Sequence, residues 1–565
     1  MHSRRDVSKI PHNHSTFLLG LAVFVFAQIF FTQISAFAQT PIRPVANPCP
    51  RPAAGGVVHN PHSLFSYNGA LTVNFSYQTR TDSDGRTLFC FMTPDGFQNP
   101  TLHVNPGDHL IINVTNNTPS TPVQMMVNQP NCGSNMMTGS SMNIHYHGTN
   151  TSPTCHQDEV IKTLINSGQT FQYNLAFPTD EPPGLYWYHP HVHGIAEAAL
   201  QGGASGALIV EGIQNLQPAV KGLRHRVLLV RDQNLSPTAD TSSGAVPSWD
   251  LTLNNIPIAF PALTPAILHM RSGEKQFWRV SNSSADSILD VQVQFNGVPQ
   301  TIQVVGIDAV PAGSQDGTRQ GKLVPVNHFV LPPAARVEFI VSAPPSTVTL
   351  AQLVTLNIPT GPAGDSDPAR PLATIKTFGT DNDGDGDNDD AVSATTSTPN
   401  GQRFEGLSTA TVTAHRTLYF SEVISDPTDP NSPTNFFITV DGATPVLFDA
   451  NNPPAIITRQ GAVEDWTIQN RAPEHHEFHF HQIHFQVLSQ NNFEVNGSVQ
   501  APGINGQFLD MIQVPFWDGD PTHPFPNVKV RMDFRGPDVG DFVYHCHILG
   551  HEDNGMMAII RVLPR

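Results

Sequence analysis

Alternating apolar and polar positions recur in three segments of the chain, each organised around a glycine. An aliphatic residue stands seven positions after the glycine and an asparagine nine positions after it: Gly107, Val114 and Asn116; Gly273, Val280 and Asn282; Gly461, Ile468 and Asn470. This pattern predicts a strand, a glycine turn and an alternating strand that ends in an asparagine turn. Its threefold use predicts an all-β chain with three similar β-sandwich domains.

The repeats predict domains at 39–216, 217–379 and 403–565. A chain of 565 residues is too long for a single core, which agrees with several domains. Residues 380–402 are acidic and rich in serine and threonine, as a solvated linker would be. Within them, aspartates alternate at 381–390 as calcium ligands would, although no glutamate follows at EF-hand spacing. A linker and a calcium loop both remain open.

Composition supports many short strands and excludes one class of partner. Charged residues make up only 13%, whereas glycine (42) and proline (50) are abundant, as expected for a chain with many turns. The net charge of −18 argues against nucleic acid, because no basic stripe is available to neutralise phosphates.

The N-terminal segment 1–38 is typical of an export signal. Basic residues at 4–9 precede an apolar run at 17–31, and Ala36-Phe37-Ala38 matches a small-x-small cleavage site. We therefore expect a periplasmic or extracellular protein whose mature chain has no membrane span. An uncleaved anchor and a twin-arginine signal are the alternatives.

A predicted strand at 541–544 runs into a loop rich in metal-binding side chains. Because successive side chains on a strand point to opposite faces, Cys546 faces away from its neighbours His545 and His547. A thiolate, two imidazoles and a weak thioether are the ligands of a blue-copper electron-transfer site. One imidazole must come from elsewhere, because this loop supplies only three of the four groups: Cys546, His551 and Met556.

Two further histidine clusters lie in the first domain. In each of them the two imidazoles share one face of a strand: His145 with His147, and His189 with His191. Gly148 and Gly194 follow these clusters, and we expect a close approach of the backbone at both glycines.

The last cluster, at 474–484, contains one His-x-x-His-x-His register: His476, His479 and His481. His479 and His481 share a strand face, whereas His476 points elsewhere and can supply the imidazole missing beside Cys546. The remaining eight histidines, two from each stretch, suit a three-copper cluster. Three nearby histidines fall outside this count and are interpreted as ordinary: His193, His475 and His484.

Together the clusters resemble the motifs of the multicopper oxidase family, which includes laccases, bilirubin oxidases and bacterial cuprous oxidases. The motifs are His145-Tyr-His147-Gly, His189-Pro-His191, His476-x-x-His479-x-His481 and His545-Cys546-His547-x3-His551-x4-Met556. The resemblance covers essentially the whole mature chain. It implies three consecutive cupredoxin-like Greek-key domains, with a trinuclear copper cluster between the first and third and no copper ligand in the second.

The same resemblance implies four copper ions. A type 1 copper would be held by His476, Cys546 and His551, with Met556 axial. A type 2 copper would take His145 and His479. A type 3 pair would take the other six histidines: His147, His189, His191, His481, His545 and His547.

Two carboxylates are carried over from this likeness as catalytic residues. Asp158 matches the acidic residue that similar enzymes place near the type 2 copper, and Glu552 matches the acid that delivers protons toward the type 3 site. Reduction of dioxygen to two waters consumes four protons inside a sealed cavity, so the chemistry needs such groups. An ordinary surface carboxylate is the alternative for each.

The chain has five cysteines, and a thiolate ligand at Cys546 leaves four for pairing in an oxidising compartment. Three pairings are possible. We favour Cys132 with Cys155, since both lie in one loop-rich region, and Cys49 with Cys90 then follows.

We predict an oxidase that takes electrons singly at the type 1 site and reduces dioxygen to water. The preferred donors are phenols and aromatic amines, as for a laccase, and the alternative is a metallo-oxidase that acts on Cu(I) or Mn(II) in copper tolerance. A group of methionines favours Cu(I), with packing under a loop as its other explanation: Met125, Met126, Met136, Met137 and Met142. The complete motif set argues against a non-enzymatic copper-binding member and a two-domain nitrite reductase.

Overall fold

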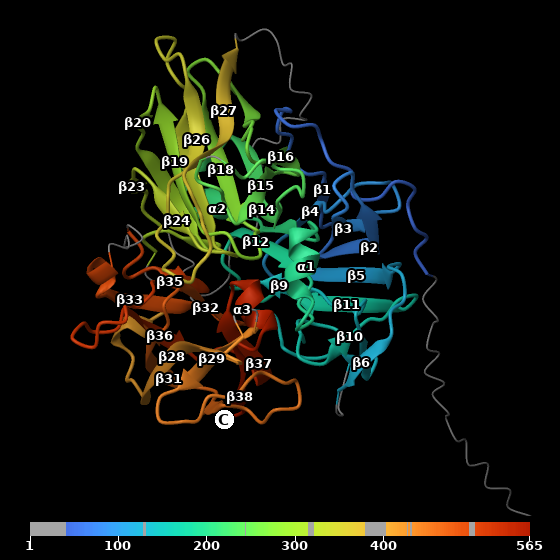
Figure 1. Ribbon diagram of the computed structural model, residues 1–565, viewed down its shortest axis with the longest axis vertical. Helices are drawn as coiled ribbons and strands as arrows, with labels where there is room; N and C mark the ends of the chain where they lie inside the picture. The colour runs from blue at the N-terminus through green and yellow to red at the C-terminus, as the bar shows by residue number, and fades with distance from the viewer. Residues whose placement is uncertain are drawn as a thin grey trace, which may run out of the picture. The chain divides into compact units, whose positions relative to one another are not determined.

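The computed structural model describes residues 41–565, except 128–131, 243, 315–320, 379–402, 427, 430–431 and 497–502. The predicted export signal at 1–38 and the acidic run at 381–390 lie outside the described residues. Almost all the regular secondary structure of the described chain is β-strand, which confirms the all-β class. Its main sheets form three successive groups along the chain, coloured blue to teal, green to yellow, and orange to red in Figure 1. The exact domain boundaries stay a prediction.

The first group lies within residues 63–210. One sheet has the order β11 (Thr170–Ala176), β5 (His109–Asn116), β2 (Ala70–Thr81), β3 (Thr87–Met92). The second has the order β1 (Ser63–Phe65), β4 (Thr101–Val104), β13 (Gly206–Val210), β12 (Gly184–His189), β9 (His145–His147). Two short ribbons add β6 (Val123–Met126) with β8 (Met136–Thr138), and β7 (Cys132–Gly133) with β10 (Thr163–Leu164).

The second group lies within residues 224–378. Its larger sheet has the order β16 (Ile256–Ile258), β15 (Trp249–Leu253), β14 (Arg224–Asn234), β18 (Lys275–Asn282), β25 (Arg336–Ser342), β21 (Ile302–Ile307), β22 (Val310–Pro311), with β23 (Val324–Val326) also on β21. The other has the order β17 (Ala266–Arg271), β27 (Arg370–Phe378), β26 (Ala351–Thr355), β19 (Leu289–Phe295), β20 (Val298–Pro299), with β24 (Phe329–Leu331) also on β19.

The third group lies within residues 414–563. One sheet has the order β29 (Thr434–Val440), β28 (Ala414–Ile424), β31 (Val463–Asn470), β36 (Asn527–Asp533), β33 (Phe485–Asn491), β34 (Phe508–Leu509). The other has the order β30 (Ile456–Arg459), β38 (Met557–Leu563), β37 (Gly540–Cys546), β32 (His476–Phe480), β35 (Met511–Val514).

Short helices connect these sheets: α1 (Ala196–Gln201), α2 (Ile213–Leu216), α3 (Leu549–Asp553), and the 3₁₀ turns η1 (Pro218–Val220), η2 (Leu407–Thr409) and η3 (Phe493–Asn496). Helix α3 is tied to α1, because Asp553 accepts hydrogen bonds from the N–H groups of Gly194 and Glu197. In the described part of the chain, no helix is long and apolar enough to span a membrane.

The three predicted repeats fold in the same way. Their glycines have positive φ angles of 87°, 76° and 101°, which favour glycine, and strands β5, β18 and β31 follow. Each strand ends on a buried asparagine whose side chain accepts a bond from the N–H two residues on and donates to two carbonyls. Such side-chain bonds make an asparagine turn. The turns predicted at three residues are therefore confirmed: Asn116, Asn282 and Asn470.

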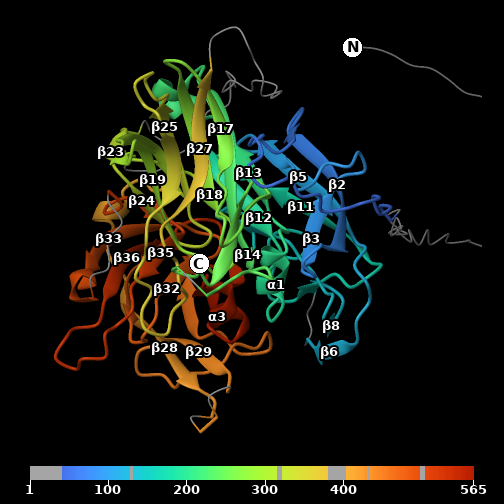
Figure 2. The same cartoon turned by 45° about the horizontal axis from the view of Figure 1, so that its top comes forward.

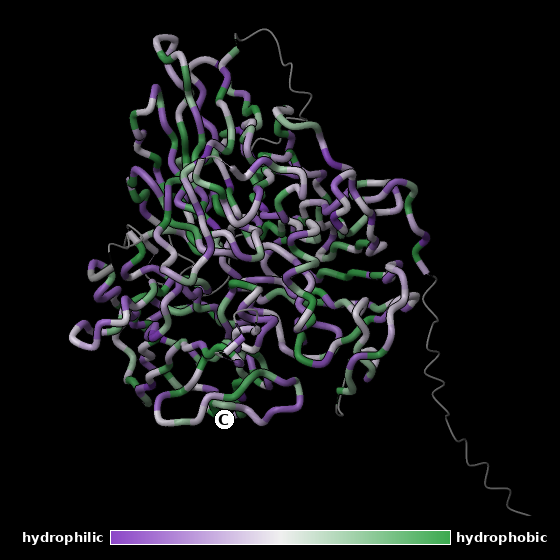
Figure 3. The backbone as a smooth tube through the Cα atoms, viewed as in Figure 1, coloured by the Kyte–Doolittle hydropathy of each residue, from purple (hydrophilic) through white to green (hydrophobic). Residues whose placement is uncertain are grey.

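Alternation along the strands places apolar side chains inside, and Figure 3 shows hydrophobic and hydrophilic positions following one another along the tube. The first group encloses its own core around Phe75 and Ile112. A larger core runs through the second and third groups and also takes in Trp187 and Leu200 of the first group. Both predicted disulfides are confirmed, Cys49 with Cys90 and Cys132 with Cys155, and Cys546 is a free thiol.

Candidate metal centre

The thiol of Cys546 faces two imidazoles. Its Sγ atom is 3.7 Å from the Nδ1 atoms of both His476 and His551. These two nitrogens are 3.0 Å apart, and all three side chains are buried. The structure thus brings together His476 and the loop after β37, and we call these residues with Met556 the thiolate cluster.

Main-chain contacts fix this loop. The N–H of Glu477 donates to Cys546 Sγ at 3.3 Å, and the N–H of Cys546 donates to the Met556 carbonyl at 3.1 Å. Met556 is fully buried and follows Gly555, whose φ is 114°. A Cβ atom at Gly555 would lie 2.4 Å from Leu447 Cδ2, so the turn that returns Met556 toward Cys546 requires glycine.

The pairing of β32 with β37 separates two faces. Phe478 lies opposite Cys546, and His479 lies opposite His545. Because alternate residues point to opposite faces, the neighbours of Cys546 turn toward His479. There they meet the histidines of β9 and β12, where His145 pairs with His189.

Eight buried histidines converge at this meeting point, and we call them the eight-histidine cluster. The Nε2 atom of His545 lies 3.2 Å from Nε2 of His191 and 3.1 Å from Nε2 of His481. The rings of His145 and His481 stack at 3.9 Å, and those of His147 and His479 at 4.0 Å. All eight predicted residues are brought together: His145, His147, His189, His191, His479, His481, His545 and His547.

These imidazoles have the chemistry of a metal site. Burial lowers the pKa of every one of them, which favours the neutral form that binds metals. Carbonyls hold Nδ1 of His189 and His545, which leaves Nε2 free to face the cluster. In the described chain several buried ring nitrogens have no hydrogen-bond partner, among them Nε2 of His145 and His479 and both nitrogens of His547. Unpartnered buried nitrogens are unfavourable unless a cation binds them, so the residues fit copper.

Asp158 orients one of these rings. Its carboxylate oxygens lie 3.0 and 3.1 Å from Nδ1 of His145, so Nε2 of that ring is directed to the cluster. The N–H of Tyr146 and the side-chain amide of Gln482 both donate to Asp158. Burial raises the pKa of Asp158 well above its usual value. Asp158 is thus a buried partner of a candidate ligand and not a surface carboxylate.

A second carboxylate, Asp510, supports two other rings, and no motif in the sequence pointed to it. Its Oδ1 lies 3.3 Å from Nε2 of His147, and its carbonyl accepts a bond from Nδ1 of His479. The guanidinium of Arg336 donates to both Asp510 oxygens, at 2.7 and 2.6 Å. Burial opposes the charge of Asp510, but Arg336 holds its pKa below the usual value. Arg336, in β25 of the second group, thus forms a fully buried ion pair with a residue that contacts the cluster.

The second group of sheets therefore contributes side chains that support the cluster, although it supplies no predicted ligand. Asp308 accepts bonds from the N–H groups of Arg336, Asp510 and Met511, and its own carbonyl accepts a bond from His484. His484, interpreted from sequence as an ordinary histidine, belongs to this network.

The two glycines behave differently. A Cβ atom at Gly148 would lie 2.4 Å from both the Arg336 guanidinium and the Asp510 carboxylate, so the expected close approach is present. At Gly194 a Cβ would meet nothing within 4 Å, so that prediction is wrong. Gly194 instead serves a turn with φ of 84°.

Two buried carboxyl groups lie close to the ligands. The oxygens of Glu552, in α3, are 3.9 Å from Nδ1 of His191 and 4.0 Å from Nδ1 of both His193 and His545. Glu477 is fully buried on the strand face that carries His479. Neither carboxyl group has a hydrogen-bond partner in the described chain, and burial raises the pKa of both.

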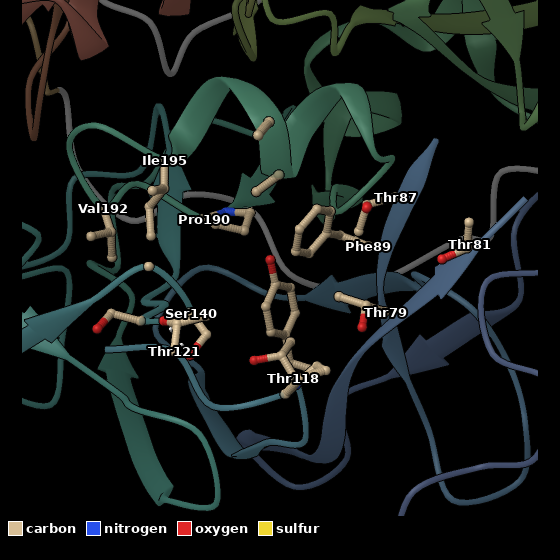
Figure 4. Close-up of a pocket in the computed structure, with 16 residues that line it drawn as sticks. Thr79, Thr81, Thr87, Phe89, Thr118, Thr121, Ser140, Pro190, Val192 and Ile195 are labelled. Atoms are coloured by element: carbon tan, nitrogen blue, oxygen red, sulfur yellow. Dashed lines mark hydrogen bonds between the residues drawn. The ribbon is translucent and has the colours of Figure 1, made fainter. Parts of the chain in front are cut away.

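A separate cavity of about 350 Å³ includes Pro190, the residue between His189 and His191, in its wall. Figure 4 shows Pro190 and Ile195 on the helix side and Thr118 and Thr121 across the cavity. Among the described residues that line it none is charged, so it suits an uncharged molecule and offers no metal ligand.

Family models for multicopper oxidases match residues 133–215 and 425–565, the two stretches that carry all ten candidate histidine ligands. The chain belongs to the multicopper oxidase family. The protein is therefore a copper-dependent oxidoreductase that uses dioxygen and a reducing substrate.

Relatives and solved structures agree with this family. The oxidase is 22% identical to a laccase of Bacillus subtilis over 82% of this chain and 88% of that one. It is 24% identical to a rice protein, multicopper oxidase LPR1 homolog 3, over 74% of this chain and 85% of that one. A variant of the Aquifex aeolicus multicopper oxidase McoA has a TM-score of 0.62 and 18% identity, and covers 90% of this chain and 100% of its own. A Campylobacter jejuni metallo-oxidase has the same score and identity, with 91% and 96% covered. These structures support the cupredoxin-like fold.

Proposed function

We propose that the oxidase is laccase-like and holds four copper ions. The thiolate cluster would hold a type 1 copper, with Met556 as its weak thioether ligand. His145 and His479 would hold a type 2 copper, and the other six histidines a type 3 pair. The observation that carries this proposal is the convergence of buried imidazoles with unpartnered nitrogens beside a buried thiol. When bound, copper supplies one-electron transfer and the reduction of dioxygen.

The chain's own groups would orient the ligands and handle protons. Asp158 and Asp510 fix the rings of His145, His147 and His479 through hydrogen bonds. Glu552 lies beside His191 and His545 in a site closed to bulk water, where a carboxyl group can hold and release the protons that water formation consumes.

Organic donors are the first choice because apolar side chains lie against the thiolate cluster. The ring of Phe436 stacks on His551 at 4.2 Å, and Leu447, packed against Gly555, is 40% exposed. Phenols and aromatic amines suit such a surface. The likeness to laccases points the same way.

One observation favours metal ions as a second class of donor. Glu474 Oε2 lies 3.5 Å from Nε2 of His551, and the carboxyl of Glu422 shares a hydrogen bond with that of Glu474. Carboxylate oxygens bind Mn(II). A metallo-oxidase activity therefore remains the alternative.

The deciding experiment is dioxygen uptake by copper-loaded protein, measured side by side with a phenol, Cu(I) and Mn(II). We expect the phenol to be oxidised fastest. Glu422→Gln should lower the rate of oxidation of Mn(II) and leave that of the phenol unchanged. An equal loss of rate with both donors would contradict the second candidate.

Copper analysis should approach four ions per chain. Calcium at 381–390 needs a separate calcium titration.

Export to the periplasm or the cell exterior is part of the proposal. It rests on the signal-like segment 1–38, and two disulfides are consistent with an oxidising compartment. Cell fractionation with N-terminal sequencing tests it, and a cytoplasmic protein that keeps residues 1–38 would contradict it.

A further inference from the structure

Four of the clustered methionines form two facing pairs on one β-ribbon. Strands β6 and β8 pair antiparallel (Figure 2). Met125 lies opposite Met137, and Met126 lies opposite Met136. Residues directly opposite share a face, with Cβ atoms about 4.5–5.5 Å apart, and adjacent residues point to opposite faces. One thioether pair therefore lies on each side of the ribbon.

The two faces have different surroundings. On the outer face Met126 is 55% exposed and Met136 is 43% exposed. On the inner face Met137 is buried and Met125 is partly buried. Packing explains buried methionines, because a flexible thioether fills irregular space. It does not explain why the outer pair stays about half exposed.

The inner pair lines a cavity of about 180 Å³ between residues of the first and third groups of sheets. Met557 adds a third thioether to its wall, and His193 adds an imidazole. The wall also includes His191, a member of the eight-histidine cluster, and no residue of the thiolate cluster. A bound ion would thus lie next to the trinuclear ligands and away from the site where donors deliver electrons.

Thioethers are soft ligands that select Cu(I) over harder divalent ions, and imidazole also binds copper. We propose that the β6–β8 ribbon and the cavity beneath it form a Cu(I) site that supplies copper to the eight-histidine cluster. The exposed pair Met126 and Met136 captures the ion, and Met125, Met137, Met557 and His193 hold it beside His191. This inference rests on the proposed copper function of that cluster.

Silver(I), a redox-inert substitute for Cu(I), tests the site in the copper-loaded protein. Calorimetric titration compares wild type with the double variants Met125→Leu/Met137→Leu and Met126→Leu/Met136→Leu. Leucine conserves volume, so both variants should fold. Met270→Leu, a buried residue of the second group, is the matched control. We expect Ag(I) affinity to fall about tenfold or more in the inner variant and to stay unchanged in the control. Equal affinity in wild type and the inner variant would overturn the site.

The supply role is tested by loading metal-free protein with Cu(I) in the absence of dioxygen. Both double variants should take up copper more slowly, by roughly tenfold, yet oxidise a phenol normally once fully loaded. Unchanged loading would overturn the supply role. If wild type binds Ag(I) at the ribbon but its eight histidines never take up copper, the proposed function fails and the Cu(I) site stands.

Discussion

The thiolate cluster and the eight-histidine cluster are built in different ways. The first takes all its predicted ligands from β32, β37 and the loop around α3, within one group of sheets. The second draws half its ligands from β9, β12 and the chain after them, and half from β32, β37 and their continuations. One site is completed within a single group of sheets, whereas the other exists only when two groups of sheets meet.

The contacts that hold the two clusters in place also differ. Main-chain N–H groups and a glycine turn hold the thiolate cluster. Side chains from far along the sequence hold the eight-histidine cluster: Asp158 with Gln482, and Arg336 with Asp510. Disturbing one cluster should therefore leave the other largely intact, and four changes test this.

The largest expected effect is that of Cys546→Ser on the thiolate cluster. Loss of the thiolate should abolish the blue colour completely, because that band arises from thiolate and copper together. The protein should remain folded and keep the copper of the eight-histidine cluster. Absorption spectra with copper analysis measure both, and a variant that loses all its copper would break the contrast.

Glu552→Gln should act on the eight-histidine cluster alone. Reoxidation of the fully reduced protein by dioxygen should slow by about 10²–10⁴, the usual contribution of a positioned proton donor. The blue band, copper content and rate of electron uptake should stay normal, since an amide preserves shape. Stopped-flow reoxidation is the measurement. A rate close to that of wild type at every pH would remove the proton role and leave Asp158 as the candidate.

Arg336→Met tests the support from the second group of sheets. Removing one partner of a fully buried pair leaves Asp510 uncompensated and should lower the free energy of unfolding by about 3–5 kcal/mol. Copper should be lost from the eight-histidine cluster before the blue band fades. Chemical denaturation and copper analysis measure these effects.

The matched control is Arg561→Met. Its pair with Asp541 has similar distances of 2.6 and 2.7 Å but is exposed, so the change should be below about 1 kcal/mol. Equal losses for the two arginine variants would show that burial of Arg336 is irrelevant.

The smallest effect is expected for Met556→Leu. Removing a weak axial thioether withdraws electron donation to oxidised copper, so the reduction potential should rise while the protein stays blue. Redox titration measures the shift. Met557 is the next residue and lines the cavity of about 180 Å³, so Met557→Leu should leave the reduction potential unchanged. A fall in Met556→Leu would assign the axial role to another group.

Periodic patterns in the sequence predicted much of the fold. The threefold spacing of glycine and asparagine predicted the turns at Asn116, Asn282 and Asn470, because side-chain bonds there span only a few residues. Alternation likewise separated Cys546 from His545, since the strand period is fixed by the backbone. The resemblance to a known family predicted which residues are candidate copper ligands, and the structure brings these residues together.

Only the tertiary structure revealed the network of Asp510, Arg336, Asp308 and His484, and the cavity that joins the methionine ribbon to His191. No spacing rule connects Arg336 with Asp510, which are 174 positions apart. The same holds for Gly148 and Gly194, which look alike in sequence although only one is crowded. Local spacing determines what a strand or loop presents, but contacts between sheets depend on how their faces pack, and that is decided by the summed burial of many side chains across the whole chain.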